Sequence, residues 1–358
     1  MGVGVVGCGN IAPIYLQNLS RFSGTRVVAV ADINLERAEA RAKEFGVPLA
    51  CDVEALLVDP EVEIVVNLTT PDAHFEVARR ALQSGKHVYN EKPIAIDVKD
   101  ADELLALAKS KNLLVGCAPD TVLGAGIQTC REIIDRGDIG APLSAQALMM
   151  CPGHEGWHPD PAFYYQKGGG PLFDMGPYYL SALVTLLGPV KRVCGLAKKS
   201  FATRTIGSEP KKGRTIQVEV PTHLVTAMEF ASGAVGQLTT SFDVQFHTLP
   251  HIEVYGESGT IRVPDPNGFG GPVSIRTKGD RDWREIKLTR PYAENARGLG
   301  VLDLAQATKT GRQSRSSGDL ARHILAVFHA AHAAPYHGRY VEVEPTDRSE
   351  AMPAHAID

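Results

Sequence analysis

Residues 3–12 are Val3-Gly4-Val5-Val6-Gly7-Cys8-Gly9-Asn10-Ile11-Ala12, and this stretch decides the fold. A strand-like run leads directly into G-x-G-x-x-A and then into a segment of helical periodicity over residues 11–22. The first glycine permits a tight turn, the second lets a pyrophosphate approach the backbone, and Ala12 lets the helix pack closely on the strand. The motif therefore predicts a dinucleotide-binding unit with the pyrophosphate at the N-terminus of the helix.

A second strand-like run, Val27 to Ala31, ends in Asp32. An acidic side chain at this place accepts hydrogen bonds from the adenosine ribose hydroxyls and repels a 2′-phosphate. Because no arginine or serine follows immediately in residues 33–35, the sequence favours NAD over NADP. Arg37 could reach the adenine, although on a helix it could equally be solvated or paired with a charged neighbour.

The first part of the chain alternates β-branched runs with helical patterns, which is typical of parallel strands joined by crossover helices. Strands are expected at 3–6, 27–31, 64–68, 87–89 and 113–116, and helices at 11–22, 35–44, 72–83 and 97–111. After a helix at 121–136, strand-like stretches follow at 143–150, 190–198, 215–230, 234–244, 252–256, 273–276 and 284–288, and a late helix at 318–334. Short turns between these later strands indicate antiparallel pairing.

We therefore expect an α/β protein of two domains. Residues 1–118 form an N-terminal Rossmann domain that binds NAD, and residues 119–358 form an α/β domain with a large open, mainly antiparallel sheet. The second domain would bind the substrate and support oligomerisation, with its C-terminal tail free to pack back on the first domain.

Composition excludes several classes of function. The 358 residues include 37 Lys and Arg against 41 Asp and Glu, without long runs of one sign, so nucleic acid is not an expected partner. No apolar run approaches the ~20 residues of a membrane span, and the chain enters a strand too early for a signal peptide. The six cysteines contain no C-x-x-C pair, which favours buried thiols in a reducing compartment. We expect a cytoplasmic protein without a membrane partner.

Glu91-Lys92-Pro93 follows the strand at 87–89, at the edge where open α/β sheets bind their ligands. A charged pair at a strand end can also simply face solvent. Pro93 restricts Lys92 to extended geometry and raises the chance of a cis bond.

Residues 151–160 are Cys151-Pro152-Gly153-His154-Glu155-Gly156-Trp157-His158-Pro159-Asp160. The histidine spacing suggests a metal site, but the prolines and glycines prevent the regular helix that would align the two imidazoles, so no metal is expected. A polar loop lining a sugar pocket fits better, with an ordered surface loop as the alternative. The glycines at 168–170 would let this loop pass close to the nicotinamide.

The motif Asp174-Met175-Gly176-Pro177-Tyr178 follows these glycines. If Gly176 begins a helix, Asp174 and Tyr178 lie on one face of it. Asp174 could instead be only the N-cap of that helix. Tyr179 points about 100° away from Tyr178 and is expected in the core.

The motifs at 7–12, 91–93 and 174–178 together resemble the glucose-fructose oxidoreductase and inositol 2-dehydrogenase family (Gfo/Idh/MocA), over essentially the whole chain. The resemblance implies a Rossmann domain followed by an α/β domain with a large open sheet, and the nicotinamide between them. It also implies oxidation or reduction of a ring hydroxyl on a sugar, glycoside or cyclitol. Many dehydrogenases of the family carry an acid/base His where this chain has Tyr178; glucose-fructose oxidoreductase and the dimeric dihydrodiol dehydrogenases carry Tyr.

Lys92, Tyr178 and Asp174 are the expected catalytic residues. A phenol has an ordinary pKa of about 10, so Tyr178 needs a nearby ammonium, here Lys92, to lower its pKa before it can act as a base. The alternative is that Lys92 accepts the proton and Tyr178 only donates a hydrogen bond.

The expected ligand contacts form two sets. NAD would be bound by Gly7, Gly9, Asn10, Ile11, Asp32, Arg37, Thr70, His74, Glu91 and Lys92. The substrate would be bound by Lys92, His154, Trp157, His158, Asp174, Tyr178 and Arg297. Arg297 lies in a loop that could close over the substrate, although its position also suits a solvated surface residue.

The expected function is that of an NAD-dependent oxidoreductase acting on a sugar, glycoside or cyclitol. Two alternatives are a catalytically silent NAD-binding sugar sensor, and an enzyme for a non-sugar carbonyl or a dihydrodiol. The presence of all three catalytic residues weighs against the sensor, and the polar loop at 151–160 weighs against an apolar substrate. Because an open sheet must bury its uncovered face, we expect a homodimer or homotetramer.

Overall fold

A computed structural model describes residues 1–357 as two compact units. Unit 1 contains Met1–Gln128, Thr289–Leu325 and the segment beginning at Ser349; unit 2 contains Thr129–Leu288 and Ala326–Arg348. The chain thus returns to unit 1 twice after leaving it. This distribution differs from the continuous ranges 1–118 and 119–358 that the sequence suggested, because later segments pack on the first sheet.

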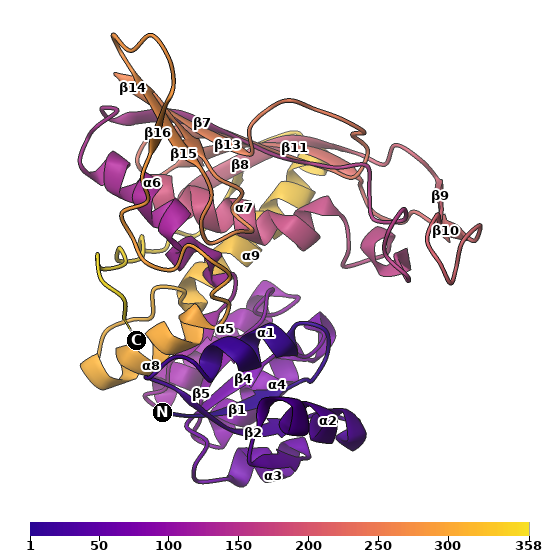
Figure 1. Ribbon diagram of the computed structural model, residues 1–358. Helices are drawn as coiled ribbons and strands as arrows, with labels where there is room; N and C mark the ends of the chain where they lie inside the picture. Colours follow the sequence, from indigo (N-terminus) through magenta and orange to yellow (C-terminus); the bar gives the residue numbers. More distant parts are fainter. Residues whose placement is uncertain (358) are drawn as a thin grey trace. The chain divides into compact units, whose positions relative to one another are not determined.

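Unit 1 is built on a six-stranded parallel sheet in the order β3-β2-β1-β4-β5-β6 (Figure 1). Its strands are β1 (Gly2–Val6), β2 (Arg26–Ala31), β3 (Leu49–Cys51), β4 (Ile64–Asn67), β5 (His87–Asn90) and β6 (Val115–Cys117). The predicted parallel sheet is confirmed. The short β3 and the helix after it were missed, because three residues give no alternation to detect. The strand order reverses at β1, so a ligand crevice is expected between the loops after β1 and β4.

The helices of unit 1 are α1 (Ala12–Leu19), α2 (Leu35–Phe45), α3 (Val53–Val58), α4 (Pro71–Gln83), α5 (Val98–Ser110) and α8 (Leu299–Thr310), with a 3₁₀ turn η1 (Asp120–Leu123). α8 packs against β5, β6 and α1. Its first turn is fixed by Asp120, whose buried carboxylate accepts hydrogen bonds from the backbone N–H groups of Gly298 (2.8 Å) and Gly300 (3.0 Å). These bonds explain why residues 289–325 belong to unit 1.

Unit 2 is built on a nine-stranded sheet in the order β16-β15-β14-β13-β7-β12-β11-β8-β17. Its strands are β7 (Pro142–Met150), β8 (Val190–Lys198), β11 (His223–Phe230), β12 (Val235–Ser241), β13 (Ile252–Gly256), β14 (Gly259–Val263), β15 (Val273–Thr277), β16 (Arg284–Ile286) and β17 (Val341–Glu342). β7 and β12 run parallel and the other neighbours antiparallel, which confirms the mainly antiparallel prediction.

One predicted strand, 215–230, is wrong. The chain forms a small separate hairpin from β9 (Thr203–Thr205) and β10 (Thr215–Gln217), and enters the large sheet only at β11. Pro221 lies between β10 and β11 and cannot donate to a strand ladder, so it separates the two strands.

One face of the large sheet is covered by α7 (Pro171–Leu187), which packs on β7, β11 and β12. α6 (Ala125–Asp135) and α9 (Gly318–His337) each carry residues of both units, and a 3₁₀ turn, η2 (Ala162–Tyr165), precedes α7. On the opposite face the described residues place no helix (Figure 1). Leu196 of β8 is 77% exposed and Val235 of β12 55% exposed, so apolar side chains remain uncovered.

We expect the fold to lose stability as the pH falls from 7 to 5. Burial lowers the pKa of His74, His87 and His332 from the ordinary value of 6.5. A histidine whose pKa is lower in the folded chain stabilises the fold fully above the unfolded pKa, and this contribution is lost as the pH falls toward the folded pKa. Each such group contributes a slope of up to about 1.4 kcal/mol per pH unit.

Asp120 opposes this effect, because burial raises its pKa to about 6 and its protonation stabilises the fold as the pH falls below that value. Urea unfolding at several pH values measures the net effect of the three histidines and Asp120 on the free energy of unfolding. In His87→Gln the decline should be smaller, since Nδ1 of His87 accepts a bond from the Leu114 N–H (3.0 Å) that a Gln carbonyl can replace. The exposed variant His247→Gln should behave as the wild type, and an unfolding free energy that rises on acidification would contradict the prediction.

Candidate active site

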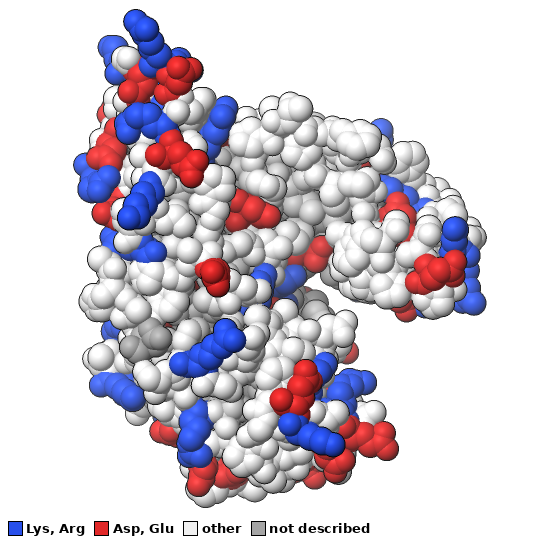
Figure 2. Space-filling view, in the orientation of Figure 1, with Lys and Arg blue, Asp and Glu red and all other residues white. Residues whose placement is uncertain are grey.

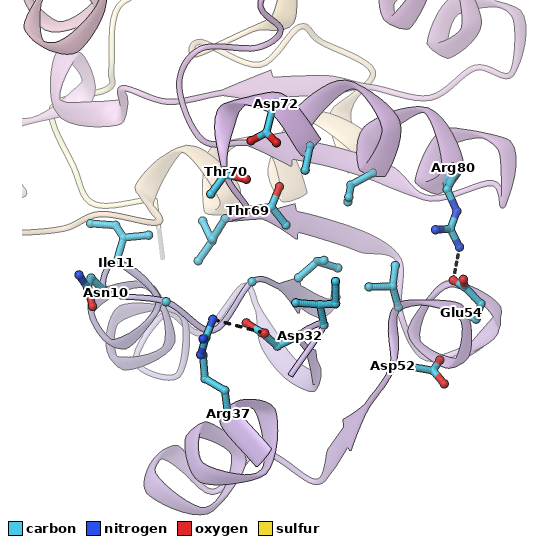
Figure 3. A pocket seen from close by; sticks show the side chains of 18 residues that line it. Asn10, Ile11, Asp32, Arg37, Asp52, Glu54, Thr69, Thr70, Asp72 and Arg80 are labelled. Carbon is cyan, nitrogen blue, oxygen red and sulfur yellow. Dashed lines mark hydrogen bonds and ion pairs between the residues drawn. The ribbon is translucent and has the colours of Figure 1, made fainter. Parts of the chain in front are cut away.

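The loops after β1, β2, β3 and β4 line a cavity of about 930 Å³ in unit 1 (Figure 3). This volume lies within the range of about 300–1,000 Å³ that is usual for small-molecule sites. Of the residues predicted to bind the cofactor, those that line it are Gly7, Gly9, Asn10, Ile11, Asp32, Arg37 and Thr70. The cavity lies where the strand order reverses, as expected for a dinucleotide site.

The two glycines of the first loop have separate roles. Gly7 has φ +98°, donates its N–H to the Ala31 carbonyl (2.8 Å), and would place an added Cβ only 2.7 Å from the backbone of Leu68. An added Cβ on Gly9 would meet nothing within 4 Å, so the backbone of Gly9 faces open space. α1 begins directly after this loop with Ala12. The loop therefore fits a pyrophosphate at the helix N-terminus.

Asp32 is buried and connects this loop to the end of β2. Its Oδ2 accepts a hydrogen bond from the Cys8 N–H (2.8 Å), and its Oδ1 accepts from the Asn34 N–H (2.9 Å) and Nη1 of Arg37 (3.5 Å). Figure 3 shows Arg37 and Asp32 facing each other at the cavity wall. Because a carboxylate offers about four acceptor positions, Asp32 retains capacity for ribose hydroxyls. Arg37 is half exposed and also pairs with Asp32.

Lys92 follows β5 in a backbone segment that is held on both sides. Oε1 of Glu91 accepts a bond from the Tyr15 hydroxyl (2.8 Å) and Oε2 accepts from the Lys92 N–H (2.9 Å). Nδ1 of His74 lies 2.6 Å from the carbonyl oxygen of Pro93, and Nε2 lies 3.0 Å from that of Thr69. The Lys92–Pro93 peptide is cis. These contacts fix the position from which the Lys92 side chain extends.

Glu91 and His74 are hydrogen-bonded inside unit 1, and their contact with NAD stays a prediction. Neither lines the cavity, and His74 is only 1% exposed. Each of the two polar side chains is hydrogen-bonded to backbone or side-chain groups of unit 1. Both residues hold the loop around Lys92.

In unit 2, α7 begins at Pro171, and its N-cap is Gly170 with φ +90°. The predicted start at Gly176 is wrong, because a proline fits the first turn and lets the helix start earlier. The alternative of Asp174 as N-cap is wrong for the same reason. Asp174 lies in the first turn of α7, where the helix dipole favours a negative charge. Asp174 and Tyr178 stay one turn apart on the same helix.

The loop at 151–160 brings His154 onto Asp174. Nε2 of His154 lies 3.1 Å from Oδ2 of Asp174, and the two side chains are 12% and 19% exposed. Aromatic rings surround this imidazole: Tyr164 at 4.1 Å, Phe242 at 4.7 Å and Trp157 at 5.4 Å between ring centroids. Burial and the charge of Asp174 raise the pKa of Tyr164 to about 12, so this phenol stays protonated.

Comparison with known proteins identifies the family. The family model of an oxidoreductase family with an NAD-binding Rossmann fold, GFO_IDH_MocA, matches residues 1–118, and the GFO/IDH/MocA C-terminal domain matches residues 127–262. The chain belongs to the Gfo/Idh/MocA family. NAD is thus its cofactor, and the protein is an oxidoreductase; the glycine loop and Asp32 fit that cofactor.

Several Gfo/Idh/MocA relatives match over long stretches. The myo-inositol 2-dehydrogenase of Thermotoga maritima is 24% identical over 348 residues, 96% of this chain and 99% of that protein. The 1,5-anhydro-D-fructose reductase of Ensifer adhaerens is 27% identical over 269 residues, 72% of this chain and 74% of that protein. The crystal structure of an NAD-binding oxidoreductase from Klebsiella pneumoniae has a TM-score of 0.85 at 22% identity, covering 97% of this chain and 100% of that one, which shows the fold.

The loop at 151–160 of this Gfo/Idh/MocA member is anchored by Arg204 of β9. The guanidinium pairs with Glu155 (2.6 Å) and Asp243, donates to the Phe242 carbonyl (2.8 Å), and is nearly buried. Charge-assisted hydrogen bonds of this kind are strong and directional, so Arg204 holds the loop in one position. These contacts order the loop, which agrees with both interpretations of it, as the lining of a sugar pocket and as an ordered surface loop. Arg204 was missed because nothing in its local sequence distinguishes it from a surface residue.

Three more of the predicted substrate residues are Trp157, His158 and Arg297. Trp157 is exposed, and His158 packs between aromatic rings of the same loop and η2. Arg297 belongs to unit 1, where its Nη1 donates to Oδ1 of Asn295 (3.1 Å). Tyr179 is buried, and its hydroxyl lies 2.9 Å from Nδ1 of His251, which confirms its place in the core.

Residues at the far end of the NAD cavity were missed by the sequence reasoning. Ile33 lines the cavity and is fully exposed, so its apolar side chain is available to an adenine ring. Glu54 of α3 and Arg80 of α4 form an ion pair at the cavity wall (Figure 3). An apolar residue directly after Asp32 is visible in the sequence, so Ile33 could have been predicted as a cofactor contact. Glu54 could not, because α3 itself was not predicted.

We expect Asp32→Asn to shift cofactor preference toward NADP. The amide keeps one acceptor for the Cys8 N–H but removes the charge that repels a 2′-phosphate. A hydrogen bond to a charged group is worth about 1.5–3 kcal/mol, so the ratio of kcat/KM for NADP to that for NAD should rise about 10- to 100-fold. Steady-state kinetics with both cofactors measure it.

The matched control is Asp52→Asn, because Asp52 is another cavity-lining carboxylate but caps α3 rather than following β2. Asp52→Asn should leave the ratio of kcat/KM for NADP to that for NAD unchanged. A wild-type protein that already prefers NADP by a wide margin would contradict the assignment of Asp32.

Proposed function

We propose that this oxidoreductase transfers hydride between NAD and a ring hydroxyl or keto group of a sugar, glycoside or cyclitol. The observation that carries the substrate class is the His154–Asp174 pair ringed by aromatic side chains. A sugar ring presents hydroxyls for polar groups and C–H faces for aromatic ones, so such a surface suits it. The names of the Thermotoga and Ensifer relatives, an inositol dehydrogenase and an anhydrofructose reductase, support the same class.

The catalytic residues in this proposal are Lys92, Asp174 and Tyr178. When bound, NAD accepts the hydride from the carbinol carbon. The chain must hold the substrate oxygen, stabilise the charge that develops on it, and take up its proton. An ammonium at Lys92 is suited to stabilise the negative charge that develops on the substrate oxygen. His154, Trp157, His158 and Arg297 are proposed to contact the rest of the substrate.

The test is a panel of sugars, glycosides and inositols assayed with the purified protein for NADH formation by absorbance. A turnover on at least one ring compound, and none on acyclic alcohols or aromatic dihydrodiols, supports the proposal. Activity confined to the dihydrodiols, or NAD binding without turnover on any compound, would replace it by one of the two alternative functions.

The protein is also proposed to form a homodimer or homotetramer through the uncovered face of the nine-stranded sheet. The exposed Leu196 and Val235 lie on strands of that sheet, and apolar surface of this kind favours self-association. Sedimentation at micromolar concentration tests it, and a monodisperse monomer would refute it.

Two observations bear on the expectation that neither a membrane nor a nucleic acid is a partner. None of the helices within residues 1–357 is long and apolar enough to cross a membrane. On the face shown in Figure 2, Lys and Arg side chains alternate with Asp and Glu and do not gather into one basic field. The cytoplasmic location stays a prediction, in keeping with six cysteines that are all free thiols.

A further inference from the structure

The imidazole of His154 is held in one orientation by groups from three segments. Asp174 of α7 contacts its Nε2 at 3.1 Å, Tyr164 of η2 packs on the ring at 4.1 Å, and Phe242, after β12, packs at 4.7 Å. The His154 backbone N–H in addition donates to the Tyr165 hydroxyl (3.3 Å). A ring that is fixed in this way presents a defined nitrogen to its surroundings.

The contact with Asp174 decides which nitrogen that is. A carboxylate accepts hydrogen bonds, so Nε2 carries the hydrogen and Nδ1 carries the lone pair. Among residues 1–357, no hydrogen bond to Nδ1 of His154 is formed. The pair therefore has the arrangement of an oriented general base, in which a carboxylate fixes the tautomer and stabilises the imidazolium that forms.

We propose that His154, oriented by Asp174, receives the proton of the substrate hydroxyl. This inference rests on the proposed function. In the oxidation the hydroxyl O–H bond breaks and its proton forms an N–H bond at Nδ1, while the carbinol carbon gives its hydride to NAD and the C–O bond becomes a carbonyl. The imidazolium then passes the proton to water. Tyr178, one turn from Asp174 on α7, holds the substrate oxygen by a hydrogen bond.

An imidazole is better suited than a phenol to this task at neutral pH. Catalysis by a general base is most efficient when its pKa lies near the working pH, and the ordinary values are about 6.5 for histidine and about 10 for tyrosine. Tyr178 would need a large depression of its pKa, whereas a histidine needs none. The oxidation should therefore slow on the acid side, where a protonated imidazole cannot accept a proton.

The charges facing His154 come from every segment that packs on it. Asp174 approaches from α7, the phenols of Tyr164 and Tyr165 from η2, and His158 from the same loop. Glu155 and Asp243 both form ion pairs with Arg204, which turns these two carboxylates toward the guanidinium. Asp174 is the carboxylate in hydrogen-bond contact with the imidazole.

The decisive variant is His154→Gln, compared with His247→Gln, which changes an exposed histidine outside the site. We expect His154→Gln to lower kcat by about 10²–10⁴-fold, to leave the affinity for NAD unchanged, and to remove the acid-side fall of the pH–rate profile. Asp174→Asn should lower kcat as well. His247→Gln should match the wild type in all three measurements.

A second readout does not depend on turnover. ¹⁵N NMR of the histidine rings in the full chain should show the Nε2–H tautomer for His154 in the wild type and a loss of that preference in Asp174→Asn. Thermal unfolding of each variant separates loss of the fold from loss of chemistry.

The outcomes are distinct. If the wild type oxidises no compound in the panel, the proposed function fails and this inference falls with it. If the wild type is active but His154→Gln keeps turnover within about threefold, or keeps the acid-side fall, then only the role of His154 is overturned. A mixed or Nδ1–H tautomer in the wild type would overturn it as well.

Discussion

Lys92→Met is expected to lower kcat by about 10²–10⁴-fold, with little change in the KM for NAD. The substitution keeps the length and apolar stem of the side chain but removes the ammonium that would stabilise the developing charge on the substrate oxygen. The position of Lys92 depends on Glu91, whose carboxylate accepts from the Lys92 N–H (2.9 Å), and on His74, whose Nδ1 lies 2.6 Å from the Pro93 carbonyl oxygen. Neither of these contacts uses the Lys92 side chain, so the loop should keep its conformation in the variant.

Lys86→Met is the matched control for Lys92. Lys86 precedes the same strand, β5, at its opposite end, and its Nζ donates to the Asp59 carbonyl (2.7 Å). This variant should lose some stability but keep kcat. If Lys92 and Tyr178 act as one unit, the double variant Lys92→Met with Tyr178→Phe should be little slower than the slower single variant. Turnover in Lys92→Met close to that of Lys86→Met would contradict the catalytic assignment.

The cofactor end of the site could be predicted from sequence because its requirements are local. The tight turn at Gly7, the open backbone at Gly9 and the acceptor at Asp32 each depend on the residue type at one position and on the strand before it. The structure places all three at one cavity, as expected. Strand periodicity predicted most strands of both sheets for the same reason. It missed β3, β14 and β17, and it joined β10 and β11 into one strand.

The substrate side could be predicted only in part, because its contacts join distant segments. His154 and Asp174 were both named as candidates, but a loop without periodicity gives no sign that the two side chains meet. His74 was expected to bind NAD, whereas its burial depends on how α4 packs on β4 and β5. Burial of a polar side chain is a property of tertiary packing, which a single sequence does not display.

Gly7→Ala and Gly9→Ala are expected to separate the folding role of the glycine loop from its binding role. In Gly7→Ala the new Cβ lies 2.7 Å from the backbone carbonyl of Leu68, and the residue must also hold φ +98°. Because both obstacles are backbone, little can move aside. We expect the free energy of unfolding to fall by about 2–4 kcal/mol and NAD binding to be lost together with it.

Gly9→Ala should behave in the opposite way. Its Cβ would enter open space in the cavity, and Gly9 is not among the residues with positive φ, so stability without cofactor should change by less than about 0.5 kcal/mol. The methyl group occupies the place where a pyrophosphate must approach the backbone. Loss of such charge-assisted hydrogen bonds should raise the Kd for NAD about 10- to 100-fold.

Gly46→Ala is the reference variant for the free-energy cost of a positive φ without a steric clash. Gly46 ends α2 with φ +66°, and an added Cβ there meets nothing within 4 Å, so its variant reports the cost of a positive φ without a clash, about 1–2 kcal/mol. Urea unfolding and calorimetric titration with NAD, applied to the three variants, give both quantities. A Gly9→Ala protein that binds NAD as tightly as the wild type would show that the pyrophosphate does not cross this loop. A Gly7→Ala protein no less stable than Gly46→Ala would show that β1 and β4 can separate at the switch point without cost.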